Sequence, residues 1–155
     1  MIRIGTRGSK LAVIQAEIIA KKIKQIDQTL NTKIEIIKTT GDIDLTSPLA
    51  EIGGKGVFVK EIEQALLEEK IDIAVHSLKD MTSLTPKELD VSAYIEAESP
   101  FDVLILNSKY KSILDLPKKA VIATGSLRRK AQLKQLFPDY KTVNIRGNIQ
   151  TRINK

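Results

Sequence analysis

The feature of this sequence that most constrains its fold is the alternation of short β-branched segments with segments of helical spacing. Residues 2–6 alternate apolar and polar side chains, as a strand does, and Leu11, Ile14 and Ile18 then recur at helical spacing. Further strands are expected at 34–38, 71–75, 91–95, 103–106, 120–123 and 142–145, and further helices at 57–69, 126–136 and after 148. Strands that alternate with helices predict an α/β fold with a largely parallel sheet.

Polar side chains follow the first and third of these strands. Arg7 and Ser9 lie between the first strand and its helix, where Ser9 is the expected N-cap. Lys79 and Asp80 come directly after the third strand. Ligands of open α/β sheets collect at the carboxyl ends of the strands. A carboxylate there can act as a general acid or base or hold a cationic group, and an ordinary surface turn is the other interpretation of Asp80. The lone His76 is interpreted as a strand-end hydrogen-bonding residue.

A second polar cluster lies where the strand at 120–123 leads into a helix. Thr124, Ser126, Arg128 and Arg129 form this turn, and Arg146 and Arg152 follow the next strand. Guanidinium groups bind carboxylates and phosphates in pairs of hydrogen bonds, and a helix start adds free N–H donors. The turn therefore predicts an anion site, while a solvated basic helix start is the alternative.

Charge is distributed unevenly along the chain, whose formal net charge is +6. Residues 1–98 hold 13 Lys and Arg against 16 Asp and Glu, whereas residues 99–155 hold 12 against 3. The composition changes near Pro100. We therefore expect two domains, 1–98 and 99–155, and the second is short for an independent core. Its positive charge suits nucleic acid or a polycarboxylate or phosphate ligand.

Several function classes are disfavoured by composition. No apolar run approaches the roughly 20 residues of a membrane span, and a signal peptide's apolar core is missing. The chain has no cysteine, hence no disulfide, thiolate nucleophile or zinc knuckle, and no metal site is predicted. The glycine-rich run around Lys55 lacks the spacing of a phosphate loop and is interpreted as a mobile flap. A cytoplasmic protein without membrane segments is the expectation.

Six blocks of the sequence resemble the porphobilinogen deaminase family and occur in its order and spacing. They are 4–12 (IGTRGSKLA), 40–42 (TGD), 53–61 (GGKGVFVKE), 72–80 (DIAVHSLKD), 125–129 (GSLRR) and 146–152 (RGNIQTR). The resemblance implies three domains. Two are similar to periplasmic binding proteins, with the active site in the cleft between them, and the third bears a cysteine. This chain would supply domain 1, without its late returning segment, and the start of domain 2, truncated before domain 3.

The resemblance also implies a function and a set of site residues. Members condense four porphobilinogens to hydroxymethylbilane, with release of ammonia, in tetrapyrrole (haem) biosynthesis. They act as monomers on a dipyrromethane cofactor linked to a cysteine by a thioether. Asp80 matches the catalytic aspartate, and Lys55 belongs to the flexible loop over the cleft. The positions that match the cofactor- and substrate-binding residues are Arg7, Ser9, Lys79, Thr124, Ser126, Arg128, Arg129, Arg146 and Arg152.

Two departures from the family pattern bear on these expectations. Gly125 stands where the family more often has serine, which removes a hydroxyl donor. The missing cysteine leaves no attachment point for the cofactor, so we expect this chain to be inactive by itself. Two other functions stay open: a non-catalytic polycarboxylate-binding module and a nucleic-acid binder. Aromatic residues make up only 4% of the chain, which disfavours the nucleic-acid binder because single-stranded bases stack on aromatic rings.

Overall fold

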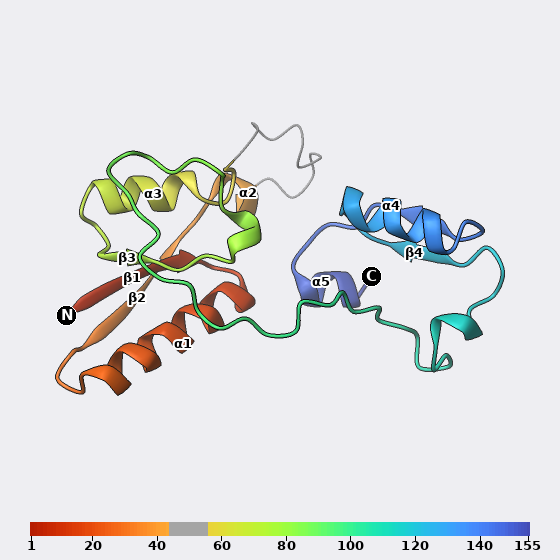
Figure 1. Ribbon diagram of the computed structural model, residues 1–155, viewed down its shortest axis with the longest axis horizontal. Coiled ribbons are helices and arrows are strands. Elements are labelled where there is room, and N and C mark those ends of the chain that lie inside the picture. Colours follow the sequence, from red (N-terminus) through yellow and green to blue (C-terminus); the bar gives the residue numbers. More distant parts are fainter. Residues whose placement is uncertain (44–55) are drawn as a thin grey trace. The chain divides into compact units, whose positions relative to one another are not determined.

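The computed structural model describes residues 1–43 and 56–155 of the chain. Its contacts divide the chain into two compact units, Met1–Tyr94 and Ile95–Lys155, and each unit is described by itself (Figure 1). The change between units falls close to the expected limit at residue 98, and the assignment of these units as domains 1 and 2 stays a prediction.

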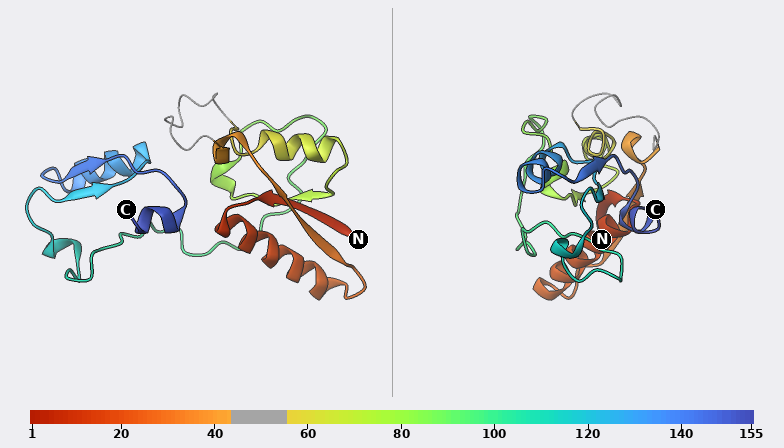
Figure 2. Two further views of the ribbon diagram at one scale, coloured as in Figure 1. Left: turned by 180° about the vertical axis from the view of Figure 1, so that it is seen from behind. Right: turned by 90° about the vertical axis from the view of Figure 1, so that its right-hand side faces the viewer.

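The first unit is a three-stranded parallel sheet between helices. Its strands lie in the order β2-β1-β3, and Ile4 at the centre of β1 is paired with Ile34 on one side and Ile73 on the other. Helices α1 and α3 lie on opposite faces of this sheet (Figures 1 and 2). The elements are β1 (Ile2–Arg7), α1 (Lys10–Ile26), β2 (Thr32–Ile37), α2 (Thr40–Ile43), α3 (Lys60–Leu67), β3 (Ile73–Ala74) and the 3-10 helix η1 (Leu78–Asp80).

A hydrogen-bonded serine cap sets the start of α1, and a small core holds α3 to the sheet. Ser9 is the N-cap of α1, and its hydroxyl accepts a hydrogen bond from the Ala12 N–H, as the sequence predicts. Ile4 and Ile62 are fully buried, and each contributes about 1.5–3 kcal/mol by leaving water. A Cβ at position 5 would lie 2.2 Å from Cδ1 of Ile71, so glycine there lets the side chain that precedes β3 pack onto β1.

The second unit contains a two-stranded parallel sheet. Strands β4 and β5 pair with Ile122 opposite Thr142, and Ile122 is buried. Ser126 is the N-cap of the helix that follows β4, as the sequence predicts, and its hydroxyl accepts a hydrogen bond from the Arg129 N–H. The elements are the 3-10 helix η2 (Ile113–Asp115), β4 (Val121–Ala123), α4 (Leu127–Leu136), β5 (Lys141–Val143) and α5 (Ile149–Ile153).

The structure confirms a mixed α/β fold with parallel sheets and corrects two expected strands. Segments 91–95 and 103–106 form no strand in the part of the chain that the structure describes. Their β-branched composition favours a strand, but a strand also needs a hydrogen-bonding neighbour, and neither segment has one here. Val103 is consequently 85% exposed. The expected strand at 71–75 is also shorter and covers only Ile73–Ala74.

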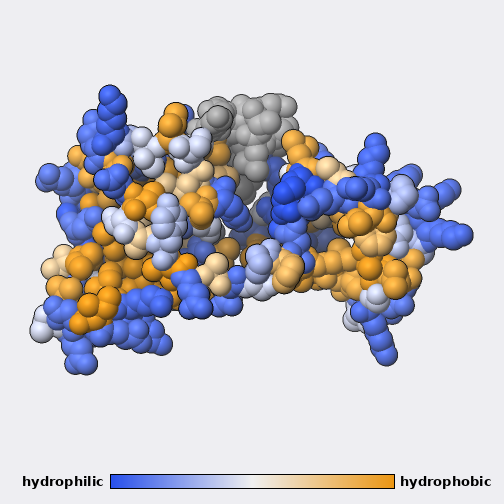
Figure 3. Space-filling view, in the orientation of Figure 1, coloured by the Kyte–Doolittle hydropathy of each residue, from blue (hydrophilic) through white to orange (hydrophobic). Residues whose placement is uncertain are grey.

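Both units leave hydrophobic residues at the surface (Figure 3). In the second unit, Phe101, Val103 and Leu136 are among the large side chains that are mostly exposed. None of the helices in residues 1–43 and 56–155 combines the length and apolar character that crossing a bilayer requires.

Candidate functional site

In the first unit, the carboxyl ends of the three strands bring charged side chains together. Arg7 is the last residue of β1, Asp42 lies in α2 just after β2, and Asp80 ends η1 just after β3. Parallel strands present their carboxyl ends at one edge of the sheet, which is where ligands of such sheets bind. The topology therefore places one guanidinium group between two carboxylates that are distant in the sequence.

Arg7 binds Asp42 through two hydrogen bonds. Its Nη2 lies 2.5 Å from Oδ1 of Asp42, and its Nε donates to Oδ2 at 3.2 Å. The Thr39 hydroxyl donates to the same Oδ2 at 2.8 Å, and Thr39 is fully buried. Burial raises the pKa of the Asp42 carboxyl, but the hydrogen bonds from Arg7 and Thr39 outweigh it and hold that pKa below its ordinary value. Asp42 is therefore ionised at neutral pH.

The remaining contacts of Arg7 join it to Asp80 and to an aromatic ring. Its Nη1 lies 3.5 Å from Oδ2 of Asp80, and its Cζ lies 3.9 Å from the centre of the Phe58 ring. A guanidinium stacked on a ring at this distance gains a cation–π attraction. A Cβ at position 41 would lie 2.1 Å from Cε1 of Phe58, so glycine at 41 leaves the space that the ring occupies.

His76 lies near the same charges and is half-buried. Burial lowers its pKa below the ordinary value, and this effect outweighs the attraction of Asp80, which acts in the opposite direction. A neutral imidazole is the result at pH 7. The neighbouring Ser77 hydroxyl donates to Oε1 of Gln15 on α1, which ties the segment after β3 to that helix.

The other expected residues of the first unit differ in what they contact. Ser9 caps α1, so its hydroxyl is already engaged with the helix backbone. Lys79 is exposed in η1, beside the half-buried Asp80. Lys55 lies outside the described residues. Sequence reasoning missed Asp42 and Phe58 as site residues, although both stand within blocks that resemble the family, and the position of Asp42 after the second strand was an available signal.

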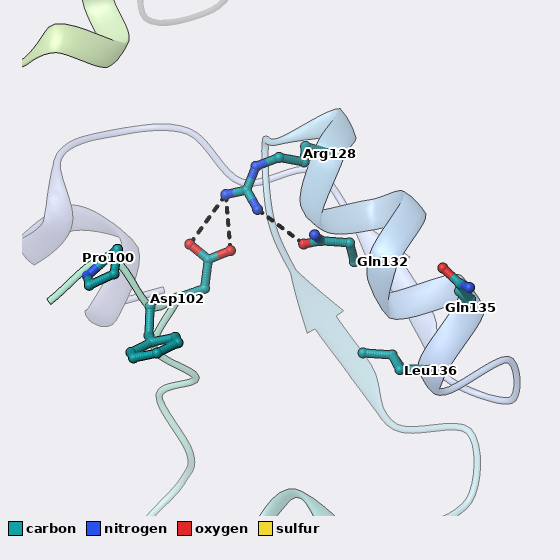
Figure 4. A pocket seen from close by; sticks show the side chains of 7 residues that line it. Pro100, Asp102, Arg128, Gln132, Gln135 and Leu136 are labelled. Atoms are coloured by element: carbon teal, nitrogen blue, oxygen red, sulfur yellow. Dashed lines mark hydrogen bonds and ion pairs between the residues drawn. The ribbon is translucent and has the colours of Figure 1, made fainter.

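In the second unit, two arginines at the start of α4 converge on one carboxylate, and Figure 4 shows the contact made by Arg128. Nη2 of Arg128 lies 3.0 Å from Oδ2 of Asp102, and Nη2 of Arg129 lies 2.7 Å from Oδ1. Hydrogen bonds from Arg129 are the main reason why the pKa of Asp102 is lowered. A pocket of about 510 Å³ adjoins this contact, lined by Pro100, Phe101, Asp102, Arg128, Gln132, Gln135 and Leu136.

The turn before α4 is held by a side-chain hydrogen bond and by a close backbone approach. Thr124 is buried, and its hydroxyl accepts a hydrogen bond from the Ser126 N–H at 3.2 Å. A Cβ at position 125 would lie 3.0 Å from the carbonyl oxygen of Ile145, a close approach that glycine permits and a serine would have to relieve. The turn therefore lies against the segment that follows β5.

The two arginines after β5 lie on that same segment. Arg146 is half-buried, and Arg152 in α5 donates from Nε to the Gly147 carbonyl at 2.7 Å. Gly147 has a φ of +116°, a conformation that favours glycine and that turns the chain into α5. Each unit thus gathers its own expected residues: Arg7 with Asp80 in the first, and Arg128 with Arg129 in the second.

Comparison with known proteins gives one consistent result. A family model described as "Porphobilinogen deaminase, dipyromethane cofactor binding domain" matches residues 2–155. The porphobilinogen deaminases of Rickettsia bellii and Rickettsia prowazekii are 49% and 50% identical to this chain over 154 residues. These residues are 99% of this chain and 51% of each relative, so the chain spans about half the length of the curated relatives it matches.

Proposed function

This chain belongs to the porphobilinogen deaminase family, and from that premise we propose that it forms the cofactor-binding part of such an enzyme. The reaction proposed for the whole protein is the stepwise condensation of four porphobilinogens to hydroxymethylbilane with release of ammonia. The proposal extends to the architecture: each unit has a parallel sheet, as expected of domains similar to periplasmic binding proteins.

The observation that carries the proposal is the convergence of Arg128 and Arg129 on a single carboxylate. The carboxylate of Asp102 is chemically equivalent to an acetate or propionate group, because both present two oxygens. Its contacts therefore indicate that the two arginine side chains can bind a ligand carboxylate at this position. A dipyrromethane carries several such groups and supplies the chain end to which further pyrroles are added. The residues proposed to hold its carboxylates, or those of the substrate, are Arg7, Ser9, Lys79, Thr124, Ser126, Arg128, Arg129, Arg146 and Arg152.

Asp80 is the proposed catalytic residue. Its carboxylate is half-buried beside a single guanidinium at 3.5 Å, which leaves oxygen lone pairs to accept hydrogen bonds from a pyrrole N–H. The same carboxylate offsets positive charge that develops when the aminomethyl group of the substrate leaves as ammonia. The chain has no cysteine, so no residue of its own can form the thioether link to the cofactor.

A titration of the chain with hydroxymethylbilane tests the proposal. The double variant Arg128→Gln/Arg129→Gln should weaken binding by about tenfold, because each exposed charge pair contributes up to about 1 kcal/mol and the variant removes two of them. The double variant Lys111→Gln/Lys118→Gln removes the same charge from exposed positions of the same unit and serves as the control.

The outcome separates the proposed function from its rivals. Loss of affinity in the arginine variant alone supports a specific tetrapyrrole site. Equal losses in both variants would indicate attraction by net charge only, and steep salt-dependent binding to random DNA would favour the nucleic-acid alternative. In the whole enzyme, Asp80→Asn should abolish turnover and largely spare binding; if turnover persists, a non-catalytic role for this carboxylate follows.

A further inference from the structure

We propose that Asp42 is a positioning residue: it holds the Arg7 guanidinium against Phe58 and thereby keeps Arg7 from closing onto the carboxylate of Asp80. The kinetic consequence of this inference rests on the proposed function, whereas its geometric part concerns only the contacts of Arg7 within the first unit.

Asp42 is itself held in place by hydrogen bonds. Its Oδ2 accepts a hydrogen bond from the buried Thr39 hydroxyl at 2.8 Å, and its backbone N–H donates to the Thr39 carbonyl at 2.9 Å. The backbone N–H of the preceding residue, Gly41, donates to the Val57 carbonyl at 2.9 Å. This bond ties α2 to the turn before α3. The carboxylate therefore has a defined place before it meets any guanidinium.

Arg7 uses different parts of its guanidinium group for its different partners. Asp42 takes the edge of the guanidinium that carries Nε and Nη2, while Phe58 covers one face at 3.9 Å. Only Nη1 is directed to Asp80, at 3.5 Å, beyond the length of a good charge-assisted hydrogen bond. Asp42 and Phe58 therefore bind one edge and one face of the guanidinium group, and neither contact involves Asp80.

If Asp42 lost its charge, Arg7 would be free to turn toward Asp80. Arg7 and Asp80 are already within 3.5 Å, and an arginine side chain is flexible enough to form a two-bond pair with the nearest carboxylate. Such a pair would occupy both oxygens of Asp80 and withdraw them from the substrate. Asp42 keeps these oxygens available because it competes successfully for the same guanidinium.

The geometric test is the side-chain NMR spectrum of Arg7 in the chain itself. A guanidinium held by two hydrogen bonds rotates slowly, so Arg7 should show a protected Nε–H and separate Nη signals, which Asp42→Asn should average. Asp72→Asn is the matched control, because Asp72 makes the same two-bond contact with Arg3 at the other end of β1. It should change the signals of Arg3 and leave those of Arg7 as they are.

The kinetic test uses the holoenzyme that contains this chain. Asp42→Asn should lower kcat by at least about tenfold, or about 1.4 kcal/mol of barrier, with a KM within about threefold of the unsubstituted enzyme. Because Asp42 acts through Arg7, the double variant Asp42→Asn/Arg7→Gln should be no slower than Arg7→Gln alone. Thr39→Val, which keeps the side-chain shape and removes one hydrogen bond to Asp42, should give a smaller loss of kcat and serves if Asp42→Asn does not fold.

Each outcome decides one of the two proposals. Unchanged Arg7 signals in Asp42→Asn would overturn the positioning role. So would averaged Arg7 signals together with an unchanged kcat, or a double variant in which the losses of kcat from the two substitutions simply add. A holoenzyme without deaminase activity before any substitution would overturn the proposed function, and the NMR comparison would still decide whether Asp42 holds Arg7.

Discussion

Substituting alanine for Gly41 tests the packing beneath the Arg7 cluster. The new Cβ would lie 2.1 Å from Cε1, 2.5 Å from Cδ1 and 2.7 Å from Cζ of Phe58, distances that real Cβ contacts do not show. Gly41 is buried in α2, and its N–H is bonded to the Val57 carbonyl, so the backbone has little room to retreat. The ring of Phe58 must leave its place below the guanidinium.

The expected loss of stability follows from two contributions. Forcing extra atoms into a packed site costs about 1–3 kcal/mol, and the lost cation–π contact with Arg7 adds about 0.5–1 kcal/mol for a partly exposed pair. Together they predict that Gly41→Ala lowers the free energy of unfolding by about 1.5–4 kcal/mol. For a domain of this size, such a loss removes a large share of the total stability.

Urea unfolding followed by circular dichroism measures the effect. Gly8→Ala is the control, since its Cβ would meet only Cγ2 of Ile36 at 3.2 Å, a contact that a small shift relieves. Gly41→Ala should lower the urea midpoint much more than Gly8→Ala does, with an unchanged slope. A loss below about 0.5 kcal/mol, or one equal to that of the control, would refute the reasoning, because it would mean that Phe58 does not fill this space.

Two further predictions concern pH. Burial lowers the pKa of His76 below its ordinary value of 6.5, so the unfolded chain binds this proton more readily than the folded chain. The free energy of unfolding should therefore fall as the pH drops from 7.5 to 5.5, and His76→Gln should flatten this slope in urea titrations; equal slopes would contradict the assignment. Hydrogen bonds from Arg3 lower the pKa of Asp72 to about 2, and carboxyl NMR titration of Arg3→Gln should return it toward 3.8, whereas an unchanged value would show that Arg3 is not the cause.

Local signals explain why part of the fold could be predicted from the sequence. Ser9 and Ser126 each precede a helix whose first turn lacks hydrogen-bond partners, and a hydroxyl at that place supplies one. The starts of α1 and α4 therefore follow from a few neighbouring residues. The strands expected at 91–95 and 103–106 fail for the opposite reason, because a strand depends on a partner that composition does not identify.

In the candidate site too, some features follow from the sequence and others depend on contacts between distant residues. The strand-end positions of Arg7 and Asp80 follow from the order of elements, so the sequence could place them at one sheet edge. The partner of Arg7 could not be predicted, because Asp42 is 35 residues away and its contact depends on the pairing of β1 with β2. Phe58 enters only through the space that Gly41 leaves open, a property of the folded backbone.

The two arginine clusters differ in how readily a ligand carboxylate can enter them. The side chains of Arg128, Arg129 and Asp102 are 61%, 47% and 38% exposed, and ion pairs at such positions contribute only about 0–1 kcal/mol. The side chains of Arg7 and Asp42 are 18% and 25% exposed. That carboxylate is also bonded to buried Thr39. Breaking the contacts of Asp102 to admit a ligand carboxylate therefore costs little free energy, whereas breaking those of Asp42 costs much more. On the proposed function, a ligand carboxylate is therefore expected to replace Asp102 at the start of α4, whereas at Arg7 it would bind beside Asp42 without displacing it.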